Sequence, residues 1–214
     1  MIGMITIKNN FLEKELIQEL ENTSMVYSKV HWVGSNAKPE NAFHKLVHKI
    51  GSSGGPYTLF RDTKISGATA WWNIRATPIA HSDLISYCTS NGVDYTPDPP
   101  PDRTYIYYLK TPEHGGRLNI YTKPSKWDET TEADSIAAIP NRLVSFPIEY
   151  IHDVNPYQGN RISIGVIFWH TLPTIYGETN PTINASYDRP WEKEENQEIN
   201  RELTIDYMNS ITND

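Results

Sequence analysis

Residues 161–170 read Arg-Ile-Ser-Ile-Gly-Val-Ile-Phe-Trp-His and contain the longest uncharged apolar run of the chain, Ile162–Trp169. β-Branched and aromatic side chains dominate this run, and such side chains fit the pleated surface of a sheet. The run is much shorter than the ~20 apolar residues that a helix needs to cross a bilayer. The stretch therefore predicts a buried strand and gives no indication of a membrane span.

Similar short runs precede this stretch from residue 58 onwards, separated by turn residues. Short strands at this spacing are typical of a sandwich, a jelly roll or a barrel. We expect a mainly β fold with flanking helices. The expected strands lie at residues 70–75, 81–87, 104–110, 117–122, 143–147, 149–154 and 161–170.

The flanking segments have a different character. Residues 11–21 and 39–50 carry apolar residues at helical spacing, and Pro39 suits the first position of the second helix. The chain after residue 171 is polar and acidic, with a helix expected from Pro190. We expect one domain over residues 1–214, in which N-terminal helical support (1–57) and a C-terminal extension (171–214) flank the β core (58–170).

Charge and cysteine content limit the partners and the compartment. The 214 residues include 19 Lys and Arg against 26 Asp and Glu, a net charge of −7, so we expect no nucleic-acid partner. Cys88 is the only cysteine, which fits a reducing compartment. With no signal-peptide pattern at the start, a cytoplasmic location is expected, which would be the host cytoplasm for a viral protein. The sequence does not indicate the oligomeric state.

A metal site is indicated by His81, Asp83 and the later His152. Residues i and i+2 of a strand point to the same face, so His81 and Asp83 can bind one ion. Two histidines and one carboxylate bind Fe(II) and leave coordination positions open. A His-x-Asp pair alone is weak evidence, because surface histidines near turns are common.

The order of several motifs resembles the Fe(II)/2-oxoglutarate-dependent oxygenases, in particular their prolyl-4-hydroxylase-like branch. The resemblance covers residues 71–169 and implies a double-stranded β-helix (jelly roll). The motifs are HSD at 81–83, RTYIYYLK at 103–110, HGGRL at 114–118, PNRLVSF at 140–146, HDV at 152–154, RISI at 161–164 and FW at 168–169.

The resemblance also implies a role for individual residues. Arg161 would pair with the distal carboxylate of 2-oxoglutarate, because a guanidinium fork donates two charge-assisted hydrogen bonds. Asn73, on the same strand face as Trp71, is a further candidate for a contact with the cosubstrate. The implied iron ligands are His81, Asp83 and His152, and the implied cosubstrate contacts are Arg161, Ser163, Tyr108 and Trp71.

The activity implied by the resemblance is hydroxylation of a C–H bond, with 2-oxoglutarate converted to succinate and CO2. Fe(II), 2-oxoglutarate and O2 are the expected cofactors and cosubstrates, and ascorbate is a candidate reductant. The substrate stays open between a peptide or protein, with peptidyl proline as one candidate, and a small molecule. Residues 88–102 are expected to cover the mouth of the site. The alternative is a non-catalytic jelly-roll binding protein that retains the fold.

Two other features have simpler interpretations. His44 and His48 lie at i, i+4 spacing on the second expected helix, with Glu40 one turn earlier. This spacing suits a metal, but flanking lysines favour a solvated helix face. Cys88 has no histidine or aspartate pattern near it and is interpreted as a buried bystander.

Overall fold

A computed structural model describes residues 5–25, 29–53, 65–74, 80–83, 101–122, 133–170, 182 and 184–188. Within these residues the helices are α1 (Lys14–Glu21) and α2 (Ala42–Ser52). The strands are β1 (Thr6–Asn9), β2 (Lys29–Gly34), β3 (Gly67–Asn73), β4 (Arg103–Lys110), β5 (His114–Gly115), β6 (Leu118–Tyr121), β7 (Asp134–Ile136), β8 (Arg142–Pro147), β9 (Ile151–Val154), β10 (Tyr157–Gln158), β11 (Ile162–Trp169) and β12 (Asn184–Asp188).

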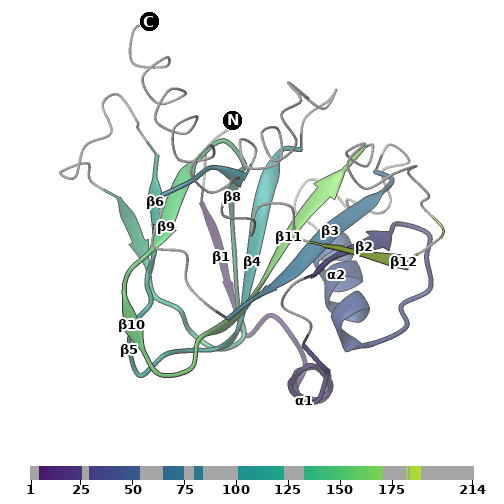
Figure 1. Cartoon of the computed structure of the whole chain (residues 1–214), viewed down its shortest axis with the longest axis horizontal. Helices are drawn as coiled ribbons and strands as arrows, with labels where there is room; N and C mark the ends of the chain where they lie inside the picture. Colours follow the sequence, from purple (N-terminus) through teal and green to yellow (C-terminus); the bar gives the residue numbers. More distant parts are fainter. Residues whose placement is uncertain are drawn as a thin grey trace, which may run out of the picture.

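The larger sheet is antiparallel and runs in the order β1-β8-β4-β11-β3-β2-β12 (Figure 1). Its central strand is β11, the strand predicted from residues 161–170, which pairs with β3 on one side and β4 on the other. Alternate side chains of β11 face opposite ways. Ile164 and Val166 join the core beneath the helices, while Ser163 lines a cavity on the other face.

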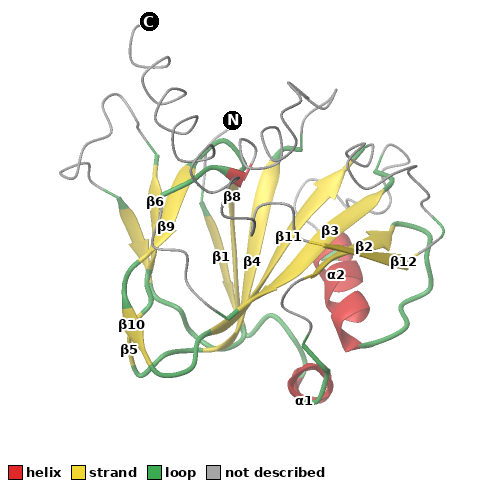
Figure 2. Cartoon of the chain, viewed as in Figure 1, coloured by secondary structure: helices red, strands yellow, loops and turns green. Residues whose placement is uncertain are grey.

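Both helices cover one face of this sheet (Figure 2). Leu20 of α1 and Phe43 and Leu46 of α2 pack with strand residues in one buried cluster. The Asn41 side chain caps α2 by accepting a hydrogen bond from the His44 amide at 2.9 Å. The prediction that Pro39 opens this helix was therefore wrong, because the stronger cap lies two residues later.

The smaller sheet covers the opposite face, in the order β7-β6-β9, with the two-strand pair β10-β5 beside it (Figure 1). Ile106 and Phe146 of the larger sheet share a buried cluster with Leu118 and Ile120 of the smaller one. Two antiparallel sheets thus enclose a core between them, which confirms the predicted jelly roll.

Several elements differ from the sequence-based expectation. β1 and β2 precede residue 58, where only helices were expected, and they join the larger sheet. In the expected strand 81–87, His81 forms a single β-bridge and residues 84–87 lie outside the described part. Residues 88–100, with Cys88, and the helix expected from Pro190 also lie outside it. No helix within the described ranges is long and apolar enough to span a membrane.

Candidate metal and cosubstrate site

Backbone pairing brings the two candidate histidine ligands together. The His81 amide donates to the His152 carbonyl at 3.0 Å, and the His152 amide donates to the His81 carbonyl at 2.9 Å. Residues paired directly across an antiparallel ladder present their side chains on the same face. The imidazole centroids consequently lie only 4.4 Å apart.

Asp83 completes this group from two residues after His81. Its Oδ1 lies 3.7 Å from His81 Nε2, and its Oδ2 lies 3.8 Å from His152 Nε2. One potential ligand atom from each of the three residues lies within 4.8 Å of the other two. Among the described residues this is the one group of three such side chains close enough to share an ion.

His152 is held in a form that can bind a metal. Its ring packs edge-on against Phe146 with centroids 4.9 Å apart, and its Nδ1 lies 3.2 Å from the Tyr150 carbonyl. Burial, reinforced by the neighbouring His81, lowers the pKa of His152 to about 4. A neutral ring whose Nδ1–H donates to that carbonyl leaves the Nε2 lone pair directed at Asp83.

The other end of the same cavity is cationic. Arg161 is 2% exposed; its Nε donates to the Gly116 carbonyl at 3.3 Å and its Nη1 to Ser163 Oγ at 3.2 Å. No carboxylate within the described ranges pairs with this buried guanidinium. A buried charge without a counter-ion is costly, so the arrangement suits an anionic ligand.

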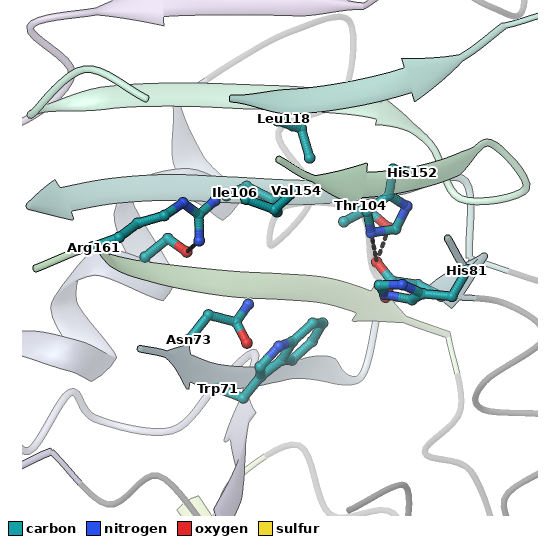
Figure 3. Close-up of a pocket in the computed structure, with 11 residues that line it drawn as sticks. Trp71, Asn73, His81, Thr104, Ile106, Leu118, His152, Val154 and Arg161 are labelled. Carbon is teal, nitrogen blue, oxygen red and sulfur yellow. Dashed lines mark hydrogen bonds and ion pairs between the residues drawn. The ribbon is translucent and has the colours of Figure 1, made fainter. Parts of the chain in front are cut away.

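The cavity joins these two ends and has a volume of about 60 Å³. Figure 3 shows His81 and His152 at one end and Arg161 at the other, with Trp71 and Asn73 along one side. Ile106, Leu118 and Val154 supply apolar walls. A ligand with one end at the histidines and an anionic group at Arg161 would be largely shielded from water.

β3 provides Trp71 and Asn73, because alternate residues of a strand face the same side. A Cβ at Gly165, the residue opposite Trp71 on β11, would lie 2.5 Å from the indole Cε2 and Cζ2. Glycine at 165 therefore makes room for the indole. Asn73 stands opposite Ser163, and its amide makes no hydrogen bond to the described residues.

Tyr108 lies next to the cationic end rather than among the cavity-lining residues. The guanidinium carbon of Arg161 is 5.2 Å from the centre of its ring. Its hydroxyl is buried and has no hydrogen-bond partner in the described part of the chain. Tyr107, the residue before it on β4, belongs to the core beneath the helices on the opposite face, as strand alternation requires.

Sequence reasoning missed Thr104 and Gly116. Thr104 Oγ donates to Asp83 Oδ2 at 2.7 Å, and both residues are buried. Thr104 has the strand parity of Tyr108, a signal that could have placed it in the cavity. Gly116 has a φ of +68°, and a Cβ there would lie 3.2 Å from Arg161 Cδ, so glycine suits both the turn and the close approach.

The interpretation of His44 and His48 as a solvated helix face was wrong. His44 is buried, and its Nδ1 accepts a hydrogen bond from the Glu40 amide at 3.3 Å. Burial lowers the pKa of both histidines. The helix packs this face towards the core, which the flanking lysines did not reveal, and the pair forms no three-ligand group with other described residues.

Comparison with known proteins gives one family match. Residues 80–169 match the model of the 2OG-Fe(II) oxygenase superfamily. A search of curated proteins finds no match. Among solved structures, a Pseudomonas putida prolyl-4-hydroxylase is similar with a TM-score of 0.52 at 14% identity, covering 78% of this chain and 92% of that one. A Trichoplax adhaerens prolyl hydroxylase, solved with a peptide fragment of the hypoxia inducible factor oxygen degradation domain, has a TM-score of 0.48 at 20% identity, covering 78% and 83%.

The matched segment contains the histidine–aspartate–histidine group and Arg161, and the jelly roll is the fold shared with the Pseudomonas enzyme. Residues 80–169, which hold these side chains, are therefore similar to the 2OG-Fe(II) oxygenase superfamily, the 2-oxoglutarate-dependent dioxygenases.

Proposed function

We propose that the protein hydroxylates a C–H bond of its substrate while 2-oxoglutarate is converted to succinate and CO2. In this proposal His81, Asp83 and His152 hold Fe(II), and Arg161 holds the distal carboxylate of 2-oxoglutarate. The single observation that carries it is a buried guanidinium without a described counter-ion, in the same cavity as a group of two histidines and one carboxylate.

The donor set suits ferrous iron. Two imidazole nitrogens and one carboxylate oxygen are the ligands of the non-haem Fe(II) oxygenases, and they leave positions open for cosubstrate and oxygen. The lowered pKa of His152 keeps its Nε2 free of a proton at neutral pH. When bound, the iron supplies the activation of O2 that couples oxidation of 2-oxoglutarate to oxidation of the substrate.

The cationic end suits a dicarboxylate. Arg161 is already oriented by Gly116 and Ser163, so little side-chain entropy is lost when a carboxylate binds. Ser163 Oγ can donate its own proton to the same anion. The Tyr108 hydroxyl lies beside Arg161 and is the third proposed cosubstrate contact, and Trp71, along the side of the cavity, is the fourth.

For the substrate we propose a peptidyl proline. The support is the fold shared with the Pseudomonas putida prolyl-4-hydroxylase, together with a cavity whose exposed side is at His81 rather than at Arg161. Ascorbate is proposed only as a reductant that maintains Fe(II) between turnovers.

Succinate formation tests the proposal directly. Wild-type protein supplied with Fe(II), 2-oxoglutarate, O2 and proline-containing peptides should form succinate, and mass spectrometry should find a peptide that gains one oxygen atom. His152→Ala should abolish both signals. His114→Ala is the matched control, because His114 is an exposed residue of strand β5 outside the cavity. Succinate formation that survives His152→Ala contradicts the proposal, and a wild-type protein that makes none favours the non-catalytic binding protein.

A further inference from the structure

One hydroxyl fixes the orientation of the candidate carboxylate ligand. Thr104 Oγ donates to Asp83 Oδ2 at 2.7 Å, and Thr104 is 1% exposed. Asp83 has no other hydrogen-bond donor in the described part of the chain apart from the two ligand imidazoles nearby. Among the described residues, the Thr104 hydroxyl is thus the hydrogen-bond donor that orients this carboxylate.

The Thr104 hydroxyl is not needed to build its own strand. The backbone of Thr104 pairs with Phe146 on β8 and with Ile167 on β11, so the ladder already fixes this residue. A β-branched side chain has few χ1 states, which makes the hydroxyl a stiff donor. Nothing else within the described ranges hydrogen-bonds to the hydroxyl.

The hydrogen bond distinguishes the two carboxylate oxygens. Oδ2 accepts a hydrogen bond from the Thr104 hydroxyl, while Oδ1 accepts none from the described residues and lies on the side of His81, 3.7 Å from its Nε2. A carboxylate with one oxygen engaged by a donor is a good ligand through the other oxygen and a poor bidentate one. If Asp83 bound through both oxygens, it would occupy a position that cosubstrate or oxygen requires.

We propose that Thr104 is a positioning residue that holds Asp83 so that it binds Fe(II) through one oxygen and leaves the neighbouring coordination position to 2-oxoglutarate. This inference rests on the proposed function, because it assumes that Fe(II) and 2-oxoglutarate share the cavity. In this proposal Thr104 acts through Asp83, by way of its hydrogen bond to Oδ2.

Metal and cosubstrate binding without oxygen test the role apart from turnover. Thr104→Val replaces the hydroxyl by a methyl of similar size, and Thr104→Ser keeps the hydroxyl. We expect Thr104→Val to bind Fe(II) about 10- to 100-fold more weakly than wild type. At saturating Fe(II) it should also bind 2-oxoglutarate more weakly, although Arg161 is intact. Thr104→Ser should restore both affinities to within about threefold.

Ser145→Ala is the matched control for losing a buried hydroxyl. Ser145 lies on the adjacent strand β8, opposite Tyr105, and outside the cavity. The Ser145→Ala variant should change neither the Fe(II) affinity nor the 2-oxoglutarate affinity. The metal-free Thr104→Val protein should unfold at a temperature close to that of Ser145→Ala. If Thr104→Val does not fold, Thr104→Ala provides the same comparison.

The outcomes separate this inference from the proposed function. If wild type binds Fe(II) and 2-oxoglutarate and Thr104→Val binds both equally well, the positioning role is wrong and the proposed function stands. The role is also wrong if Thr104→Ser is as weak as Thr104→Val. If wild type binds no Fe(II), the proposed function fails, and the role of Thr104 fails with it.

Discussion

His81 and His152 exchange both of their backbone hydrogen bonds, at 3.0 and 2.9 Å, although they lie far apart in the sequence. This bridge sets the imidazole spacing without help from the side chains, so the site exists before a metal arrives. Binding to a preformed site costs less conformational entropy than assembling ligands from separate loops. The same bridge joins the segment 80–83 to the smaller sheet through β9.

Replacement of the buried guanidinium should affect cosubstrate binding selectively. Arg161→Gln removes the charge, and we expect the KM for 2-oxoglutarate to rise at least about tenfold, since a charged hydrogen bond contributes roughly 1.5–3 kcal/mol. The KM of Arg161→Lys should lie between those of wild type and Arg161→Gln, because an ammonium group keeps the positive charge but not the two-pronged geometry of the guanidinium. Fe(II) affinity should not change in either variant.

The matched control for Arg161 is Arg117→Gln. Arg117 is exposed and hydrogen-bonds to Ser135 rather than to the cavity. Steady-state kinetics with varied 2-oxoglutarate measure the effect. An Arg161→Gln enzyme with a KM within twofold of wild type would show that the anion binds elsewhere.

The close packing of Gly165 against Trp71 predicts sensitivity to a single methyl group. Gly165→Ala would place a Cβ 2.5 Å from two indole carbons, so the ring must move. We expect the free energy of unfolding to fall by about 1–3 kcal/mol, as is usual for overpacking, and 2-oxoglutarate to bind more weakly. Urea denaturation measures the free energy of unfolding.

A double variant identifies the cause of that loss. Because Trp71→Leu removes the obstructing ring, Gly165→Ala combined with Trp71→Leu should be more stable than the sum of the single effects predicts. Strict additivity of the two substitutions would mean that the indole does not cause the strain at Gly165.

The buried histidine predicts how stability depends on pH in the metal-free protein. Burial and the adjacent His81 lower the pKa of His152 to about 4, against ~6.5 in the unfolded chain. The unfolded state therefore binds more protons between these values, so this contribution to stability is present above pH ~6.5 and is lost as the pH falls through about 4.

Thermal unfolding of metal-free protein from pH 7 to pH 4 checks this sign. His152→Gln cannot titrate and should lose stability less steeply over that range than wild type, while other groups titrate equally in both proteins. Parallel curves for the two proteins would contradict a depressed pKa at His152.

The sequence predicted the parts of the fold that depend on local pattern. The apolar run predicted β11, and the runs at residues 70–75 and 104–110 predicted the strands β3 and β4 that pair with it. β1 and β2 were not predicted. They pair with β8 and β3, which are distant in the sequence, and their short segments of mixed polarity do not indicate this pairing. Asn41 rather than Pro39 opens α2, because a side-chain cap outweighs the helical preference of proline.

The candidate site, like the fold, could be predicted in part from the sequence. The motif order singled out His81, Asp83, His152 and Arg161, and the structure brings all four to one cavity. The orientation of Asp83 by Thr104 could not be read from the chain, because it depends on contact between distant segments. The absence of a described counter-ion for Arg161 likewise appears only in three dimensions.

The most direct test of the site is a titration of 2-oxoglutarate into Fe(II)-loaded protein without oxygen, monitored by visible absorption. A weak charge-transfer band should appear and saturate when the ketoacid binds beside iron held by His81, Asp83 and His152. In Arg161→Gln the same band should require a higher concentration of 2-oxoglutarate. No band at saturating Fe(II) and 2-oxoglutarate in wild type would contradict the account.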